Sequence, residues 1–110
     1  MERSENSPEG TGAVLSYLRM TIGAEHSAVF EADLARMVTL AREQPGFRWV
    51  ETYQRQGEPC TYLVLSEWDS LDAMRGWLRH PDHLEVLRNY KRRYQGGKVE
   101  RRRYALLPPK

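Results

Sequence analysis

Three histidines are the side chains best suited to proton transfer, because imidazole changes charge near neutral pH with an ordinary pKa of about 6.5. His83 follows the His80-Pro81 step that predicts a helix start, and His26 precedes an earlier helical segment. His83 is therefore the candidate general base. A helix-capping or interface role is the competing interpretation for His83, and capping or solvent contact is the simpler role for His80 and His26.

The sequence shows no pattern for a metal site or for the common catalytic motifs. His80 and His83 stand three residues apart, but the nearby Asp82 projects from another part of the helix, so no zinc-type ligand set forms. Cys60 is the single cysteine and cannot form an intramolecular disulfide. There is no glycine-rich phosphate loop, serine nucleophile elbow or flavin signature. We expect neither a bound metal nor a cofactor.

Two further side chains could bind a ligand near a catalytic base. Trp68 stands where a strand ends beside a helix start, a place where pockets open, although packing in the core is an equally simple role. Arg19 is a long cation in a segment otherwise rich in apolar residues. It either extends to the rim of the fold or faces an anionic ligand.

Period-two alternation of apolar residues predicts the strands that must position these groups. The four predicted strands cover residues 14–22, 47–54, 61–68 and 99–107. A short connection makes the second and third strands a hairpin. Both faces of the first three strands carry large apolar side chains, which a cover of helices on one face cannot bury. We therefore expect a second copy of the chain to pack against the open face of the sheet.

Helical spacing predicts three helices between these strands. The first starts near Ser27, which can act as its cap, and the second follows Ser70. The third starts at Pro81 and continues to about Tyr94. The resulting order of strand, helix, strand, strand, helix pair and strand is the split βαβ pattern. It predicts an α+β, ferredoxin-like protomer with a four-stranded antiparallel sheet and helices on one face.

Length and composition fit one folded unit of 110 residues, which we place at 13–107, with short tails at 1–12 and 108–110. Apolar runs reach only three residues, so we expect no membrane segment and a cytoplasmic protein. Net charge is −6 over residues 1–74 and +8 over residues 75–110. The favoured interpretation of the basic end is a solvated rim of the fold. A contact for an anionic ligand or partner comes second, and nucleic-acid binding is the least favoured interpretation.

Several spaced residues resemble the antibiotic biosynthesis monooxygenase (ABM) domain of the dimeric α/β-barrel superfamily, over about residues 13–107. The residues that carry this resemblance are Pro45-Gly46-Phe47, Ser66-Glu67-Trp68-Asp69-Ser70, Ala73, Trp77 and His83. It implies a homodimer whose sheets form a barrel and a pocket in each protomer between sheet and helices. Activities in this family include cofactor-free oxygenation of aromatic polyketides such as anthrones, quinol oxidation and oxidative haem degradation, and related barrels act as polyketide cyclases.

Two departures from the family pattern narrow these activities. Haem-degrading members have an Asn on the first strand and an iron-binding His in the third helix, where this sequence has Leu18 and Leu87, so haem degradation is disfavoured. Anthrone oxygenases have an Asn on the third strand and a Tyr in the second helix, where this sequence has Val64 and Met74. A non-oxidative ligand-binding or cyclase-like barrel is therefore the alternative to a monooxygenase.

The resemblance and the residues together predict a cofactor-independent monooxygenase that acts on an aromatic polyketide or quinol-like small molecule. Such chemistry needs a base, donors for a substrate oxyanion and a dry aromatic pocket. The predicted catalytic residues are His83, Trp68 and Arg19, and the predicted substrate-binding residues are Tyr17, Trp49, Val64, Met74 and Trp77.

Overall fold

The sheet of the computed structural model, which describes residues 12–108, contains four antiparallel strands in the order β2-β3-β1-β4. Its strands are β1 (Val14–Thr21), β2 (Phe47–Arg55), β3 (Glu58–Trp68) and β4 (Glu100–Ala105). β2 and β3 form the predicted hairpin, and β1 pairs with β3 on one side and with β4 on the other. Most ends of the four strands fall within two residues of the predicted bounds. The exception is the start of β3, which lies three residues before its predicted start. The proposed tails fall almost entirely outside the described residues.

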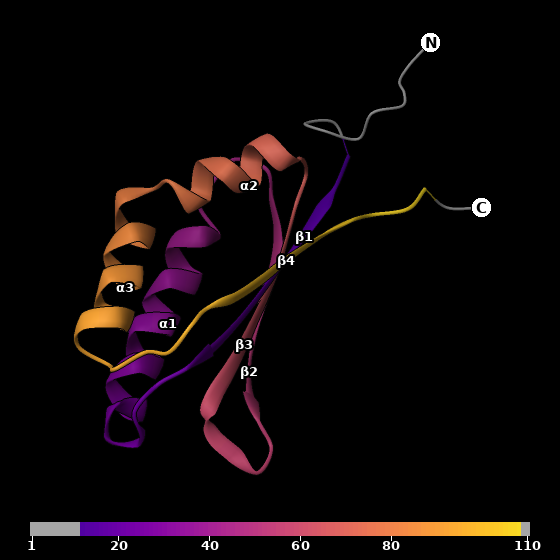
Figure 1. Ribbon diagram of the computed structural model, residues 1–110. Coiled ribbons are helices and arrows are strands. Elements are labelled where there is room, and N and C mark those ends of the chain that lie inside the picture. Colours follow the sequence, from indigo (N-terminus) through magenta and orange to yellow (C-terminus); the bar gives the residue numbers. More distant parts are fainter. Residues whose placement is uncertain (1–11, 109–110) are drawn as a thin grey trace.

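All the helices cover one face of this sheet (Figure 1). They are α1 (Ser27–Ala41), which follows a short 3-10 turn η1 (Ala24–His26), then α2 (Leu71–Leu78) and α3 (Pro81–Arg92). The fold class is therefore confirmed as α+β and ferredoxin-like for the protomer. The long α1 and α3 lie side by side, whereas the short α2 crosses the end of the sheet near the start of β1 (Figure 1).

Local signals explain where two of the helices begin. Ser70 accepts a hydrogen bond from the backbone N–H of Ala73 and so caps α2, as predicted. The imidazole of His80 accepts from the N–H of Asp82 and caps α3 one residue before Pro81. The prediction that Ser27 caps α1 is wrong, because the preceding 3-10 turn makes Ser27 the first residue of the helix itself.

Alternation along the strands divides the sheet into a buried and an open face. On β1 the even-numbered residues from Val14 to Met20 are buried against the helices, and the odd-numbered residues face the other way. The buried core between sheet and helices includes Phe30 of α1, Trp68 of β3 and Tyr90 of α3. These large aromatic side chains supply much of the hydrophobic stabilisation of the fold.

The open face of the sheet is rich in apolar side chains. Leu63 and Leu65 lie at its centre, and Trp49, Tyr53 and Tyr104 around them are 38%, 46% and 49% exposed. After β4 the chain continues away from the helices, and Leu106 and Leu107 are also exposed there (Figure 1). No described residue of the chain covers this face.

Gly46 fixes the approach of β2 to α2. Its φ of +79° lies in the left-handed region, and a Cβ atom built there would lie 2.5 Å from the Cβ of Ala73. Its carbonyl accepts a 2.7 Å hydrogen bond from the N–H of Asp69. The turn between α1 and β2, which contains Gly46, therefore also fixes the position of the residues just before α2.

Candidate functional site

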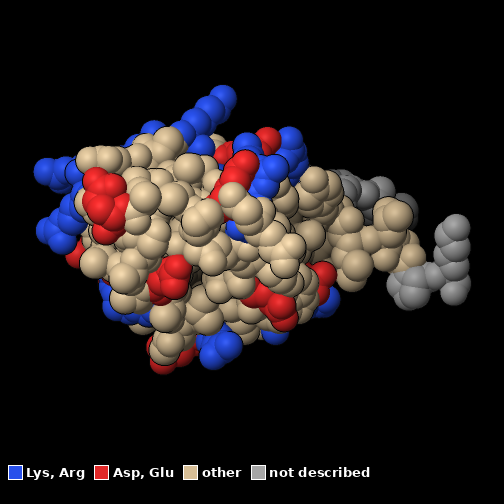
Figure 2. All heavy atoms as spheres, turned by 90° about the horizontal axis from the view of Figure 1, so that it is seen from below, with Lys and Arg blue, Asp and Glu red and all other residues tan. Residues whose placement is uncertain are grey.

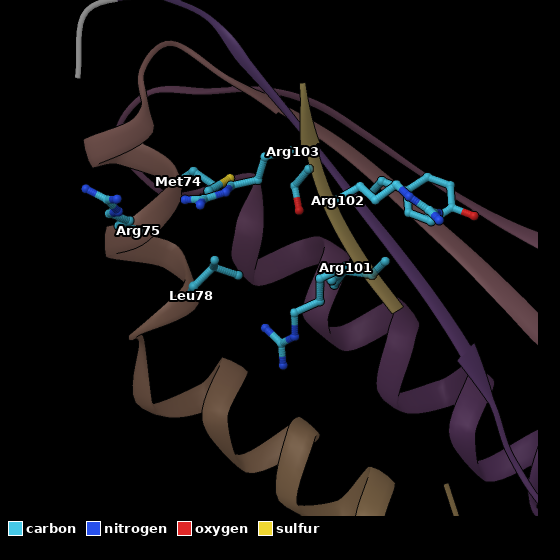
Figure 3. Close-up of a pocket in the computed structure, with 9 residues that line it drawn as sticks. Met74, Arg75, Leu78, Arg101, Arg102 and Arg103 are labelled. Carbon is cyan, nitrogen blue, oxygen red and sulfur yellow. The ribbon is translucent and has the colours of Figure 1, made fainter. Parts of the chain in front are cut away.

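An open pocket of about 650 Å³ lies between α2 and the strands β1 and β4. One wall is formed by Met74, Arg75 and Leu78 of α2 (Figure 3). The floor is formed by residues 16–18 of β1, and the opposite wall by residues 101–103 of β4. This volume is within the range of small-molecule binding sites.

A second, much smaller cavity of about 20 Å³ lies deeper, between the sheet and the helices. It shares Ser16, Leu18 and Leu78 with the large pocket, so the two spaces adjoin at these residues. His83 and Trp68 line its inner part. The space is large enough for one water molecule but not for an aromatic ring.

His83 is buried in this small cavity as a neutral imidazole. Only 1% of the residue is exposed, and its Nδ1 has no hydrogen-bond partner among the described residues. Burial lowers the pKa of His83 to about 4, and the positive charge of Arg101 and the nearby His80 add to this effect, while the backbone of Leu78 partly opposes it. The pKa lies below the ordinary value near 6.5 because a cation at this position would lose its hydration.

Trp68 and Trp77 line the small cavity together with His83, and Phe47 packs against Trp68. Trp68 is fully buried, and its Nε1 donates a 3.0 Å hydrogen bond to Oγ of Ser66. Its indole ring stacks on that of Trp77 at 6.3 Å between centroids, and Phe47 packs edge-on against its other side. The Trp77 ring in turn meets the His83 ring edge-on at 5.1 Å. This packing fixes the imidazole in a dry aromatic environment.

The structure brings together five of the eight predicted site residues. His83, Trp68, Trp77 and Val64 line the small cavity, and Met74 lines the large pocket. All five side chains belong to the layer between the sheet and the helices.

The other three predicted residues, Tyr17, Arg19 and Trp49, lie on the open face of the sheet, although Tyr17 also borders the large pocket. Arg19 is exposed and donates a 2.7 Å hydrogen bond to Glu100, and this contact holds the pKa of Glu100 below its usual range. Trp49 donates through Nε1 to Glu67 at 2.8 Å. Because the sheet lies between these groups and His83, one protomer does not combine them in one site.

Arginines of β4 and α2 are the pocket residues that the sequence analysis did not assign to the site. Arg101 and Arg103 extend from β4 toward α2, whereas Arg102 extends to the other side of the sheet (Figure 3). Arg102 lies over the ring of Tyr17 at 5.4 Å and pairs with Glu100 at 2.8 Å. Alternation within the predicted last strand, residues 99–107, places Arg101 and Arg103 on one face and Arg102 on the other. This alternation is the sequence signal that could have assigned Arg101 and Arg103 to the pocket.

Within residues 12–108, no group of three or more His, Cys, Asp or Glu side chains is arranged to hold a metal ion. Over the same residues, none of the helices has the length and apolar character needed to cross a membrane.

The fold and the pocket define a ferredoxin-like α+β protein with a ligand-sized space between its sheet and its helices. The chain belongs to the antibiotic biosynthesis monooxygenase family, whose model matches residues 14–89. It is 36% identical over 64 residues to YqjZ of Bacillus subtilis (strain 168), an uncharacterized protein. That match spans 57% of this chain and 54% of YqjZ, about half the length of that relative.

Solved structures of low sequence identity share the fold. A candidate antibiotic biosynthesis monooxygenase from Deinococcus radiodurans matches with a TM-score of 0.81 and 21% identity, over 87% of this chain and 94% of that one. SnoaB, a cofactor-independent oxygenase from Streptomyces nogalater, matches with a TM-score of 0.75 and 23% identity, over 90% of this chain and 97% of SnoaB. Rv0793 from Mycobacterium tuberculosis matches with a TM-score of 0.77 and 18% identity, over 88% and 97% of the two chains.

Proposed function

We propose that this protein is a cytoplasmic, cofactor-independent monooxygenase that oxidises an aromatic polyketide-like or quinol-like small molecule in the pocket beside α2. The observation that carries the proposal is the neutral, buried His83, which lines a cavity next to that pocket and whose Nδ1 has no hydrogen-bond partner among the described residues. A neutral imidazole with a free nitrogen can accept a proton. Family membership and the fold shared with SnoaB support the same reaction class.

The reaction begins with proton transfer from the substrate toward His83. Because the small cavity has room for one water molecule, that water can relay the proton from a ring in the large pocket to Nδ1. The carbanion or phenolate left behind is electron-rich enough to pass one electron to O2. For an anthrone, the complete reaction converts the ring methylene to a carbonyl and consumes one O2, with the second oxygen atom and the two hydrogens leaving as water.

The buried tryptophans serve this step by excluding bulk water. Trp68 and Trp77 close the side of the small cavity away from the pocket. Without competing solvent, a proton on His83 and a negative charge on the substrate stabilise each other more strongly than they would in water. A bound anionic substrate therefore offsets the burial that makes His83 a weak base on its own.

A non-oxidative ligand-binding or cyclase-like protein is the second candidate function. Val64 and Met74 favour it, since neither side chain can donate a hydrogen bond at the places where the resemblance implies an Asn and a Tyr. In that case the pocket holds its ligand and His83 moves a proton, but no O2 is consumed.

Oxygen uptake with a panel of anthrones and hydroquinones, in the presence of a metal chelator, tests the proposal. We expect uptake by the natural protein that falls by about 100-fold in His83→Gln, in line with the usual contribution of a general base. His26→Gln, which removes an imidazole that lines neither the large pocket nor the small cavity, should retain the activity. Turnover without oxygen uptake would favour the second candidate, and equal uptake by His83→Gln would refute the role of His83.

We also propose that a second copy of the chain covers the open face of the sheet. A group of neighbouring apolar side chains that is exposed on both central and edge strands marks an interaction site in soluble proteins. The face is continuous from Trp49 on β2 through Leu65 on β3 to Tyr104 on β4. A two-fold dimer would place each of these residues against the same surface of the partner copy.

Sedimentation at micromolar concentration tests this assembly. We expect a species of twice the mass of one chain, and we expect Leu65→Asp to be monomeric because it places a charge at the centre of the interface. Leu84→Asp is the matched control, since Leu84 is also 40% exposed but lies on α3 in the helical layer. A monomeric natural protein, or a dimer that survives Leu65→Asp and not Leu84→Asp, would exclude this arrangement.

A further inference from the structure

The pocket beside α2 carries a concentration of positive charge that the proton transfer to His83 does not use. Arg101 and Arg103 line one wall and Arg75 the other, and the pocket has no carboxylate among its lining residues. Within the described part of the chain, none of these three arginines forms an ion pair. Arg102, one position away, pairs with Glu100 on the open face.

The three arginines border one concave pocket. Acidic and basic side chains are interspersed on the face seen in Figure 2, with no continuous field of one sign. A groove that tracks a nucleic-acid backbone needs such a continuous positive surface. The concave shape of the pocket and its limited volume instead suit one small molecule.

The inner part of the same pocket is apolar. Leu18, Met74 and Leu78 lie between the arginines and the cavity of His83. A ligand that satisfies both parts has a hydrophobic body and an anionic end. The planar guanidinium fork matches the two oxygens of a carboxylate, and such charge-assisted pairs are stronger than neutral hydrogen bonds.

We propose that the ligand of this pocket is an aromatic acid, with its carboxylate bound by Arg101 and Arg103 at the opening and its ring held against Leu18, Met74 and Leu78. This inference rests on the proposed function for the location of the substrate and adds its chemical class. Arg75 of α2 also borders this pocket, but its side chain extends to the side of α2 away from Arg101 and Arg103 (Figure 3).

The position of Arg101 connects this binding site with the base. Its positive charge contributes to the low pKa of His83, together with burial and His80. A carboxylate bound to Arg101 would offset that charge and make protonation of His83 less costly. An acidic substrate would therefore strengthen the base that acts on it, whereas a neutral analogue would not.

Calorimetric titration of the full chain with anthraquinone-2-carboxylate and its neutral carboxamide tests the inference. We expect the carboxylate to bind about tenfold more tightly, the effect of one charge-assisted hydrogen bond. Arg101→Gln and Arg103→Gln should each reduce this preference, because each weakens binding of the carboxylate more than binding of the carboxamide. Arg102→Gln removes the same charge from a residue that also borders the pocket but whose side chain extends to the opposite face of the sheet (Figure 3), and it should keep the preference.

Four results would overturn the inference. Equal affinity of the natural protein for the two probes would do so while leaving the monooxygenase proposal intact, as would a preference lost equally in Arg102→Gln. Displacement of the carboxylate probe by inorganic phosphate at comparable affinity would show a simple anion site instead. If neither probe binds, the inference fails, and oxygen uptake from neutral anthrones then decides separately whether the proposed function also fails.

Discussion

Acidification should destabilise this protein through one buried imidazole. In the folded state His83 takes up a proton only near pH 4, because burial and Arg101 lower its pKa. In the unfolded chain the same group binds a proton near its ordinary pKa of about 6.5. Between these two values the unfolded state holds one more proton, so the free energy of unfolding must fall as the pH falls through this window.

The size of the effect follows from the separation of the two pKa values. One pKa unit corresponds to about 1.4 kcal/mol, so full passage from above pH 6.5 to about pH 4 removes roughly 3 kcal/mol of stability. That is a large share of the roughly 5–15 kcal/mol that holds a domain of this size folded. Glu100 loses its own contribution to the free energy of unfolding at lower pH, because the hydrogen bond from Arg19 lowers the pKa of this carboxylate.

Urea unfolding of the natural protein and of His83→Gln, at one protein concentration and several pH values, isolates this contribution. Carboxylate effects are common to both proteins and cancel in the difference. We expect the stability gap between them to narrow by roughly 3 kcal/mol from neutral pH to about pH 4. In an NMR titration, the imidazole that is missing from His83→Gln should be the one with the lowest pKa. A gap that does not change with pH, or a His83 resonance that titrates near 6.5, would refute the reasoning.

Two further changes test the packing around the site. Gly46→Ala should lower the free energy of unfolding in urea by roughly 3 kcal/mol, because it adds a clash with Ala73 to the backbone strain. Gly57→Ala has a similar φ of +83° but open space around it, so it should cost about 1 kcal/mol. Equal losses in the two variants would contradict the contact. Ser66→Ala should cost about 1–3 kcal/mol by leaving the indole N–H of Trp68 buried without an acceptor; no loss in the same assay would mean that this hydrogen bond contributes nothing.

Much of the fold follows from local signals in the sequence. Alternation located the strands, and Ser70 and Pro81 located the starts of α2 and α3, because caps and proline act within one turn of the chain. The helix stripe that includes Phe30 and Leu34 was likewise readable as a buried face. These signals need no knowledge of distant contacts.

The site was harder to predict because it depends on which face of each strand the helices cover. Alternation placed Arg19 opposite Leu18, so once helices cover the Leu18 face, Arg19 and His83 are on opposite sides of the sheet. The prediction that Arg19 and His83 share one site did not take this alternation into account. The arginine wall depends in addition on the register that pairs Arg101 with Leu18. The elements from α1 to α3 all lie between the paired strands β1 and β4 in the chain, so no turn sequence fixes that register.

The transfer of oxygen from O2 to an aromatic substrate is the most direct measurement of the central claim. Mass spectrometry of the product formed from an anthrone under heavy-isotope oxygen gas, with chelator present, should show one labelled oxygen atom per molecule. The label should appear at a much lower rate with His83→Gln. An unlabelled product, or labelled product at the rate of a protein-free control, would contradict the assignment of this pocket as an oxygenase site.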